Sequence, residues 1–251
     1  MKKLNHSKLI VSHIFILILG ITLGVGITQY DFEENNLIGE RLNFEGIMIK
    51  GTSPVAAVTN NQEGILGRVN VEITSGTGLR LINTNPFLEP DTQFSANTAV
   101  DIAEIVTGKN LDDKNVIIDF EIEGTVLGGP SAGAAMTLAT IAAIEGEELE
   151  NIVITGTILP SGVIGAVGGI LEKGQAAAER GTNVFLVPTG QSTLRYYERR
   201  VEQGENERGF RILNTFLIPK TVNLRAYFKE EHDLEVVEVM TIRDAMDYAF
   251  A

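Results

Sequence analysis

The chain has 251 residues, of which 44% are hydrophobic and 21% charged, so a substantial core can form and wholesale disorder is excluded. It contains no cysteine, which excludes disulfides, thiolate catalysis and thiolate zinc sites. The net charge of −13 argues against nucleic acid as a partner, because an acidic surface repels phosphate.

The N-terminal residues predict a membrane anchor. Residues 9–28 read LIVSHIFILILGITLGVGIT and contain no Asp, Glu, Lys or Arg. Twenty helical residues span about 30 Å, the thickness of the hydrocarbon core of a bilayer. Lys2, Lys3 and Lys8 precede the run, so the positive-inside rule predicts a single-pass protein of the cell membrane with an extracytoplasmic body. A secreted protein, released by signal-peptide cleavage, is the alternative.

The remaining chain divides into a short polar tether and one globular domain. We expect the anchor or signal segment at 1–30, the tether at 31–45 and the domain at 46–251. At the start of the domain, apolar and polar residues alternate as in strands. We predict a strand, a turn at Gly51–Pro54 and a second strand within 44–58, and then strands at 64–74, where residues 69–73 alternate, and at 79–82.

The middle of the domain mixes helices and strands. Apolar residues at helical spacing predict a helix at 95–106, which Gly108 ends as a C-terminal cap. Further along the chain we expect a strand at 116–123, a break at Gly128–Pro130, a helix at 132–145, a strand at 152–157 and a Gly-rich hairpin or loop at 158–169.

The C-terminal third begins with a predicted helix at 170–180, closed by Gly181, and a strand at 184–187. The charged segment 192–208 predicts a solvated helix, and strands or loop follow at 210–218 and 222–228. After a strand at 234–239, Thr241 to Asp244 form a capping box for a helix to Ala251. Without a strict βαβ repeat, the fold class is α+β, that is, mixed α/β.

Elimination narrows the chemistry. Of three histidines, only His232 lies in the domain, in an acidic segment typical of an exposed surface, which argues against a Ser-His-Asp site and a histidine metal site. The phosphate-binding pattern G-x-x-x-x-G-K is absent: the one Gly-Lys pair is Gly108-Lys109, and position 103, where the pattern requires a glycine, is Ala103. We expect no cofactor. Carboxylate-only Mg²⁺ or Ca²⁺ sites stay open.

Serine and lysine remain as candidates. Ser131 lies between Pro130 and Ala132 at a break between strand and helix, where backbone N–H groups can face an oxyanion. Lys173 lies near a helix N-terminus among small and apolar residues, and both features lower the pKa of a lysine toward that of a usable base. Taken singly, however, a Ser after Gly-Pro is usually a helix cap and a helical Lys is usually solvated.

Several motifs in order resemble one family. GGPSAG at 128–133 is followed by a lysine in GGILEKGQAAAERG at 168–181, with ITGT at 154–157 between them. An apolar helix, a Gly and a strand ending in Pro188 come next. This arrangement resembles the proteolytic domain of Lon, the S16 serine peptidases.

The resemblance implies residue roles and an assembly. It makes Ser131 the nucleophile, Lys173 the general base and Thr155 the residue that orients the lysine, with Gly129, Pro130 and Ala132 supporting the nucleophile. The implied fold is related to the second domain of ribosomal protein S5. The implied assembly is a homo-oligomeric ring, usually a hexamer, and the implied partners are protein or peptide substrates.

Two departures point to a subgroup. Gly128 stands where cytoplasmic ATP-dependent Lon usually has Asp, and Thr157 where it often has Glu. Both are similar to membrane-anchored Lon-like proteases lacking the ATPase module. The resulting hypothesis is an ATP-independent serine endopeptidase with a Ser-Lys dyad that cleaves unfolded or peptide-like substrates at the membrane. The alternative is a catalytically silent Lon-like domain acting as a binding or scaffold module.

Overall fold

The computed structural model describes residues 40–41, 48–205 and 211–250. The contacts of the chain group Glu40–Ala251 into one compact unit. The predicted membrane span at 9–28 and most of the predicted tether lie outside the described residues, and the predicted domain boundaries stay predictions.

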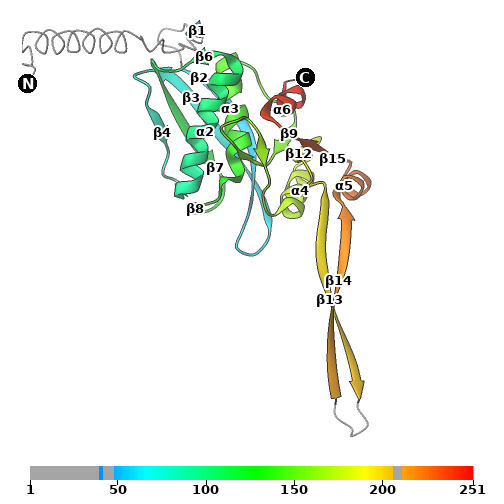
Figure 1. Cartoon of the computed structure of the whole chain (residues 1–251). Coiled ribbons are helices and arrows are strands. Elements are labelled where there is room, and N and C mark those ends of the chain that lie inside the picture. The colour runs from blue at the N-terminus through cyan, green and yellow to red at the C-terminus, as the bar shows by residue number, and fades with distance from the viewer. Residues whose placement is uncertain (1–39, 42–47, 206–210, 251) are drawn as a thin grey trace, which may run out of the picture. The chain divides into compact units, whose positions relative to one another are not determined.

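A mixed seven-stranded sheet forms the centre of this unit (Figure 1), in the order β15-β12-β9-β2-β3-β7-β4. The neighbours β2, β3 and β7 are antiparallel, and the remaining neighbours are parallel. The strands are β2 Ile49–Val58, β3 Gly64–Ser75, β4 Arg80–Ile82, β7 Lys114–Glu121, β9 Ile152–Ile154, β12 Val184–Pro188 and β15 Glu235–Val239.

Helices and short strand pairs complete the domain. The helices are α2 Pro90–Thr107, the 3₁₀ turn η1 Pro130–Ala132, α3 Gly133–Glu145, α4 Ile170–Glu179, α5 Leu224–His232 and α6 Ile242–Ala249. The short pairs are β1 Glu40–Arg41 with β6 Lys109–Asn110, β5 Phe87–Leu88 with β8 Val126–Leu127, and β10 Thr157–Ile158 with β11 Ile164–Gly165. These elements confirm the mixed α/β fold class.

The sheet has helices on both faces. Successive side chains of a strand point to opposite faces. Val55 of β2 therefore packs into the core cluster that includes α2, α3 and α6, whereas Ala56 packs into the second cluster with α4 and α5. α3 is apolar all round and buried along almost its whole length, as expected of a helix that lies between a sheet and other helices.

The predicted single-pass membrane location is contradicted by the described helices. In residues 40–41, 48–205 and 211–250, no helix is both long and apolar enough to cross a membrane. α3 is apolar but has only 13 residues, and the 18 residues of α2 include Asp91, Asp101 and Glu104.

The predicted turn at Gly51–Pro54 is wrong, because β2 runs through it without a break. Gly51 serves close packing instead. A Cβ there would overlap the Ala139 carbonyl oxygen and the Ala143 backbone nitrogen of α3. Proline has no N–H to donate to a neighbouring strand. Pro54 is tolerated because the edge of β2 that faces β9 is paired only at Val55, so few hydrogen bonds are lost there.

The predicted helix at 192–208 is also wrong. Thr193–Glu205 is strand β13, which pairs along its whole length with β14, Arg211–Asn223. We call this two-stranded ribbon the arm; it projects from the body next to α5 (Figure 1). The high charge suggested a solvated helix, but aromatic and β-branched residues are interspersed among the charges of β13 and make up much of β14, and cross-strand pairs of such residues favour strands.

Other boundaries follow the predicted signals. α2 ends at Gly108 in the left-handed conformation, and α6 begins at a Thr241–Asp244 capping box in which each side chain bonds the other residue's backbone. α2 also begins earlier than predicted, at Pro90, a residue whose fixed φ suits the first turn of a helix.

The contact between β2 and α3 gives a stability prediction. We expect Gly51→Val to lower the free energy of unfolding by about 1–3 kcal/mol, because the new side chain must displace helix backbone in a packed core. Urea unfolding measures the change. The control is Gly168→Ala, whose added Cβ meets no atom within 4 Å. Equal stabilities of the Gly51→Val variant and the unchanged protein would contradict the packing described.

Candidate active site

Ser131 lies on the turn that joins β8 to α3. Gly129 has a φ of 85°, a left-handed conformation that a residue with a side chain rarely adopts, and Pro130 then starts η1. This sharp turn leaves Ser131 half-exposed at the start of the helical segment that α3 continues. The predicted break between strand and helix is therefore present, and the catalytic role of Ser131 stays a prediction.

The first turns of α2 hold this segment in place. Thr92 Oγ1 donates a hydrogen bond to the Gly129 carbonyl at 3.0 Å, and Ser95 Oγ donates to the Pro130 carbonyl at 3.3 Å. Asp91 accepts a hydrogen bond from the Gly129 N–H at 3.3 Å. Thr92 and Ser95 are buried, so their two bonds are shielded from bulk water and support the backbone at Gly129 and Pro130.

The junction of β9 and β10 holds the other side of the turn. The Gly156 N–H donates to the Ser131 carbonyl at 3.0 Å, and the Ala134 N–H donates to the Gly156 carbonyl at 3.1 Å. Buried Thr155 lies next to this pair; its Oγ1 accepts a hydrogen bond from Lys173 Nζ at 3.1 Å. At 3.5 Å, Thr155 Oγ1 is also at the limit of a hydrogen bond to the Ser131 carbonyl.

Lys173 is buried in the second turn of α4. Its exposed fraction is 3%, and Ile170 and Ala177, which share its face of α4, belong to an apolar cluster. This burial lowers the pKa of Lys173 to about 8, against a smaller opposing effect of the Glu172 carboxylate. At pH 7, about a tenth of the molecules therefore carry a neutral Lys173, a far larger fraction than for a solvated lysine at the same pH.

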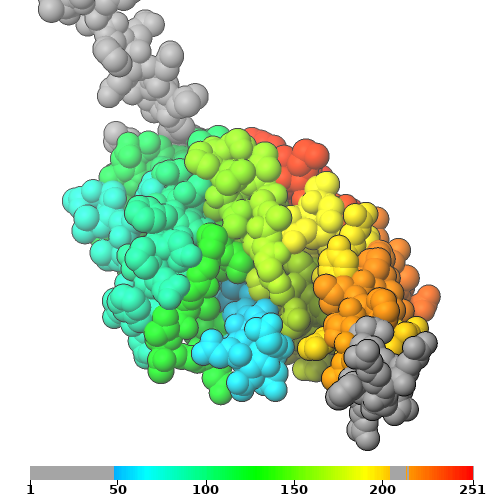
Figure 2. Space-filling view, turned by 60° about the horizontal axis from the view of Figure 1, so that its bottom comes forward, coloured from blue at the N-terminus to red at the C-terminus, as the bar shows by residue number. Residues whose placement is uncertain are grey.

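A cleft joins these groups. Its volume is about 990 Å³, and it is lined by Gly128 to Ala132, by the end of β2 and the loop after it, by Thr157 and by residues 166–169 together with Lys173. In Figure 2, the loop after β2 (cyan), the segment before Ser131 (green) and residues 157–169 (yellow-green) lie side by side on one face. Ser131 and Lys173 therefore border one solvent-accessible space.

Backbone N–H groups suited to an anion lie in the same turn. The N–H groups of Ser131 and Ala132 lie in the first turn of η1. The first N–H groups of a helical segment have no carbonyl before them in that segment to accept their hydrogen bonds, so these two have no partner within it. The Gly129 N–H points elsewhere, because it donates to Asp91. The predicted 129–132 anion site is thus narrowed to the amides of Ser131 and Ala132.

Gln191 ties the root of the arm to the cleft. Its Oε1 accepts the Val167 N–H at 2.9 Å, and its Nε2 donates to the Val167 carbonyl at 2.7 Å. Val167 borders the cleft just before Gly168-Gly169, the segment that leads into α4 and Lys173. One side chain therefore satisfies both backbone groups of a cleft residue, as a neighbouring strand would.

The structure brings together all the predicted site residues: Gly129, Pro130, Ser131, Ala132, Thr155 and Lys173. Within the described residues, the hydrogen bond of Lys173 Nζ goes to Thr155 and not to the Ser131 hydroxyl. Sequence reasoning missed Asp91, Thr92, Ser95 and Gln191. Thr92 and Ser95 offered a faint signal, because two polar residues three apart share a helix face that is otherwise apolar.

The geometry agrees with comparisons to known proteins. Residues 97–195 match the family model of the Lon protease (S16) C-terminal proteolytic domain. The resemblance to Lon proteolytic domains is confirmed. The matched range contains the turn at Ser131, Thr155 and Lys173, but the matches do not bear on the closer likeness to membrane-anchored relatives without an ATPase module.

Individual relatives are distant and longer. A Lon protease of Mesomycoplasma hyopneumoniae is 29% identical over 48% of this chain and 14% of its own length. An archaeal Lon protease of Thermoplasma acidophilum is 29% identical over 56% and 22%. Lon protease 2 of Bacillus subtilis is 26% identical over 53% and 26%. The chain thus covers about a quarter or less of these relatives, and the likeness supports a protease.

The Gln191 clamp gives a prediction of local stability. Gln191→Ala removes both hydrogen bonds to Val167, so we expect the free energy of unfolding to fall by about 1–3 kcal/mol and the Val167 amide to exchange faster with solvent. Hydrogen exchange with mass spectrometry and urea unfolding measure the two effects. Gln191→Glu is the matched variant, because it keeps the acceptor for the Val167 N–H and loses only the donor. Unchanged exchange at Val167 in the alanine variant would contradict the clamp.

The buried lysine gives a pH prediction. The pKa of Lys173 is about 8 in the folded chain and 10.5 when unperturbed, so the unfolded chain binds more protons between these values and stability rises with pH there. The full difference corresponds to about 3 kcal/mol. Denaturant unfolding across this range should show the rise in the unchanged protein and a smaller rise in Lys173→Met. Parallel curves would mean that Lys173 keeps an ordinary pKa.

Proposed function

We propose that this chain is a serine endopeptidase in which Ser131 is the nucleophile and Lys173 the general base. One observation carries the proposal: a lysine buried at the edge of a cleft, with its pKa lowered to about 8, shares that cleft with a serine on a sharp turn. A serine hydroxyl needs a base near neutral pH, and a lysine can act as that base only when it is neutral.

Thr155 orients the base in this mechanism. A neutral amine has two N–H donors and one lone pair. The hydrogen bond from Lys173 Nζ to Thr155 Oγ1 uses one donor, so the lone pair stays available for the hydroxyl proton of Ser131. The buried hydroxyl of Thr155 offers no charge that would raise the pKa of the lysine again.

Acylation follows from this arrangement. Lys173 Nζ takes the proton of Ser131 while Oγ forms a bond to the carbonyl carbon of the scissile peptide. The negative oxygen of the tetrahedral intermediate lies against the N–H groups of Ser131 and Ala132. The intermediate collapses when the C–N bond breaks, and Lys173 returns the proton to the leaving amine.

Deacylation uses the same groups in reverse. Lys173 takes a proton from a water molecule, whose oxygen attacks the ester carbonyl. The bond to Ser131 Oγ breaks, and the serine regains its proton from Lys173. Neither half-reaction consumes a nucleotide, so we propose that peptide hydrolysis at this site is independent of ATP.

The substrate strand has a place to bind. β2 pairs with β9 at Val55, whereas its last residues, Ala56 to Val58, pair with β3 on one side and border the cleft. An extended peptide can therefore add to this edge through main-chain hydrogen bonds. Such binding needs an unfolded segment, which supports unfolded or peptide-like proteins as the substrate class.

The proposal is tested with an unfolded protein as substrate and mass spectrometry of the products. Ser131→Ala and Lys173→Met should each abolish cleavage, because each removes a group that forms or breaks bonds. Below pH 8 the activity of the unchanged protein should rise about tenfold per pH unit and level off above it. Thr155→Val should retain activity at a reduced level with the midpoint of the pH profile shifted.

The outcomes separate enzyme from binding module. Activity that survives both Ser131→Ala and Lys173→Met would show that the proposed pair is wrong. If the unchanged protein neither cleaves nor reacts with a serine-acylating probe at any pH, the catalytically silent binding or scaffold role replaces the protease. Cleavage that requires added ATP would contradict only the proposed independence of ATP and would leave the roles of Ser131 and Lys173 standing.

A further inference from the structure

The arm presents an exposed apolar surface away from the core. Each of its strands has 13 residues, so the ribbon is about 40 Å long. At its base Leu194 and Val222 pack against the second core cluster. Farther out, Tyr197, Leu213 and Leu217 are 70, 63 and 64% exposed. An isolated two-stranded ribbon is marginally stable in water, and apolar groups gathered on one indicate a surface for binding.

The register sorts the arm's residues onto two unlike faces. Directly paired residues of antiparallel strands share a face, and alternate residues along a strand do so too. Tyr197 pairs with Pro219, Arg199 with Leu217 and Val201 with Thr215. We call this the Arg face after Arg195 and Arg199; near the tip the register adds the pair Glu205 and Arg211 to the same face.

The opposite face satisfies its own charges. There Lys220 lies 3.4 Å from Glu198, and Arg200 lies 3.3 Å from Glu202. Glu198 and Glu202 thus lie on this face, whereas Glu205, opposite Arg211 near the tip, is the acidic residue of the described arm that the register puts on the Arg face. The Arg face therefore combines exposed apolar groups with Arg195 and Arg199, and its acidic residue, Glu205, lies six residues beyond Arg199 and opposite Arg211.

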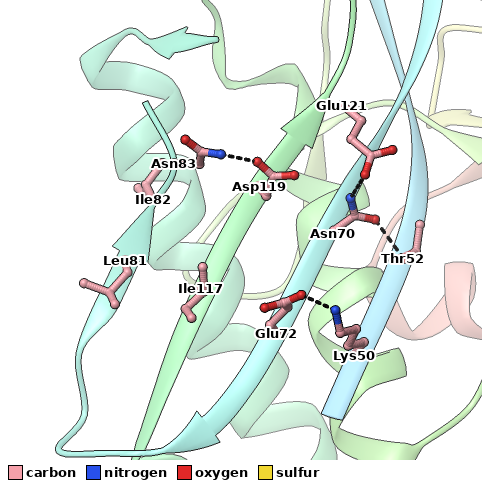
Figure 3. A pocket seen from close by; sticks show the side chains of 10 residues that line it. All are labelled: Lys50, Thr52, Asn70, Glu72, Leu81, Ile82, Asn83, Ile117, Asp119 and Glu121. Carbon is pink, nitrogen blue, oxygen red and sulfur yellow. Dashed lines mark hydrogen bonds and ion pairs between the residues drawn. The ribbon is translucent and has the colours of Figure 1, made fainter. Parts of the chain in front are cut away.

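The body carries a hollow of complementary character (Figure 3). It lies on the same face of the sheet as α4. That helix covers the face near Ala56 of β2 and leaves it open near Lys50, where the hollow has a volume of about 620 Å³. Leu81 and Ile117 supply its apolar wall. Figure 3 shows its carboxylates directed over the strands.

The charge of this hollow is negative. Lys50 is paired with Glu72. Asn83 donates a hydrogen bond to Asp119, and Asn70 donates to Glu121 at 2.9 Å. Because asparagine is neutral, these bonds orient the two carboxylates without cancelling their charge.

We propose that the Arg face of the arm docks on this hollow in a second copy of the chain. Arg195 and Arg199 lie about 13 Å apart along β13, and Asp119 and Glu121 lie about 7 Å apart along β7, a difference that long arginine side chains can span. The arginines then reach Asp119 and Glu121, and Tyr197 and Leu217 cover Leu81 and Ile117. The arm projects away from the body that carries it (Figure 1), so the hollow it fills belongs to another copy.

The contact is heterologous, since an arm on one copy meets a different surface on the next. Such contacts repeat head to tail and close into a ring when the rotation between copies permits. The surfaces named here go beyond the proposed catalytic site and do not depend on it, because assembly is measured by mass and catalysis by cleavage.

A charge-swap experiment tests the proposal on the full chain. One variant carries Arg195→Glu and Arg199→Glu, and a second carries Asp119→Arg and Glu121→Arg. In sedimentation velocity across a dilution series, the unchanged chain should associate and each variant alone should sediment as a monomer. An equal mixture should associate again, because reversed arms meet reversed hollows and unchanged arms meet unchanged hollows.

Controls keep the result unambiguous. Arg200→Glu changes the same charge on the opposite face of the arm and should associate like the unchanged chain. Asp119→Asn with Glu121→Gln keeps the shape of the hollow and should weaken association, while circular dichroism confirms that every variant is folded. A monomeric unchanged chain, an arm variant that associates normally, or a mixture of folded variants that stays monomeric would each overturn the proposal.

Discussion

The burial of one amino group is the constraint on which the rest of the site depends. A lysine out of water pays for its charge in desolvation, and here that cost lowers the pKa of Lys173 to about 8. The side chain is buried, and Thr155 accepts its hydrogen bond. Remove that burial, and Lys173 becomes an ordinary cation.

The sheet order explains why distant segments converge on this group. β9 lies between β12 and β2, so its end brings Thr155 and Gly156 next to the turn at Ser131 on one side and to α4 on the other. Side chains of α2 hold the same turn by donating hydrogen bonds to the carbonyl groups of Gly129 and Pro130. The site is therefore a meeting of four chain segments, and the turn at Ser131 is held through hydrogen bonds to its backbone.

Local signals in the sequence predicted much of this arrangement. Gly108 and the Thr241–Asp244 box mark real helix ends, because capping is chemistry between near neighbours in the chain. The pairing of Ser131 with Lys173 came from the order of several motifs and is compatible with their shared cleft. Gly51 misled because a glycine needed for close packing against α3 looks the same in sequence as a glycine needed for a turn.

Features that depend on long-range contact could not be read in this way. Asp91, Thr92 and Ser95 reach a turn almost forty residues later in the chain, and Gln191 reaches back to Val167. The arm was taken for a helix because its charges dominate a single strand, whereas the pattern becomes plain when β13 and β14 are read as a pair. Only the register shows that one face of the arm has arginines and the other has ion pairs.

Direct titration of Lys173 tests the central claim most plainly. The unchanged chain and Lys173→Met, each labelled with ¹³C at lysine Cε, are followed by NMR as pH is raised, and the resonance missing from the variant belongs to Lys173. A midpoint near pH 8, well below those of the other lysines, is the result expected of a buried base beside Ser131. A midpoint near 10.5, with the other lysines, would contradict the account.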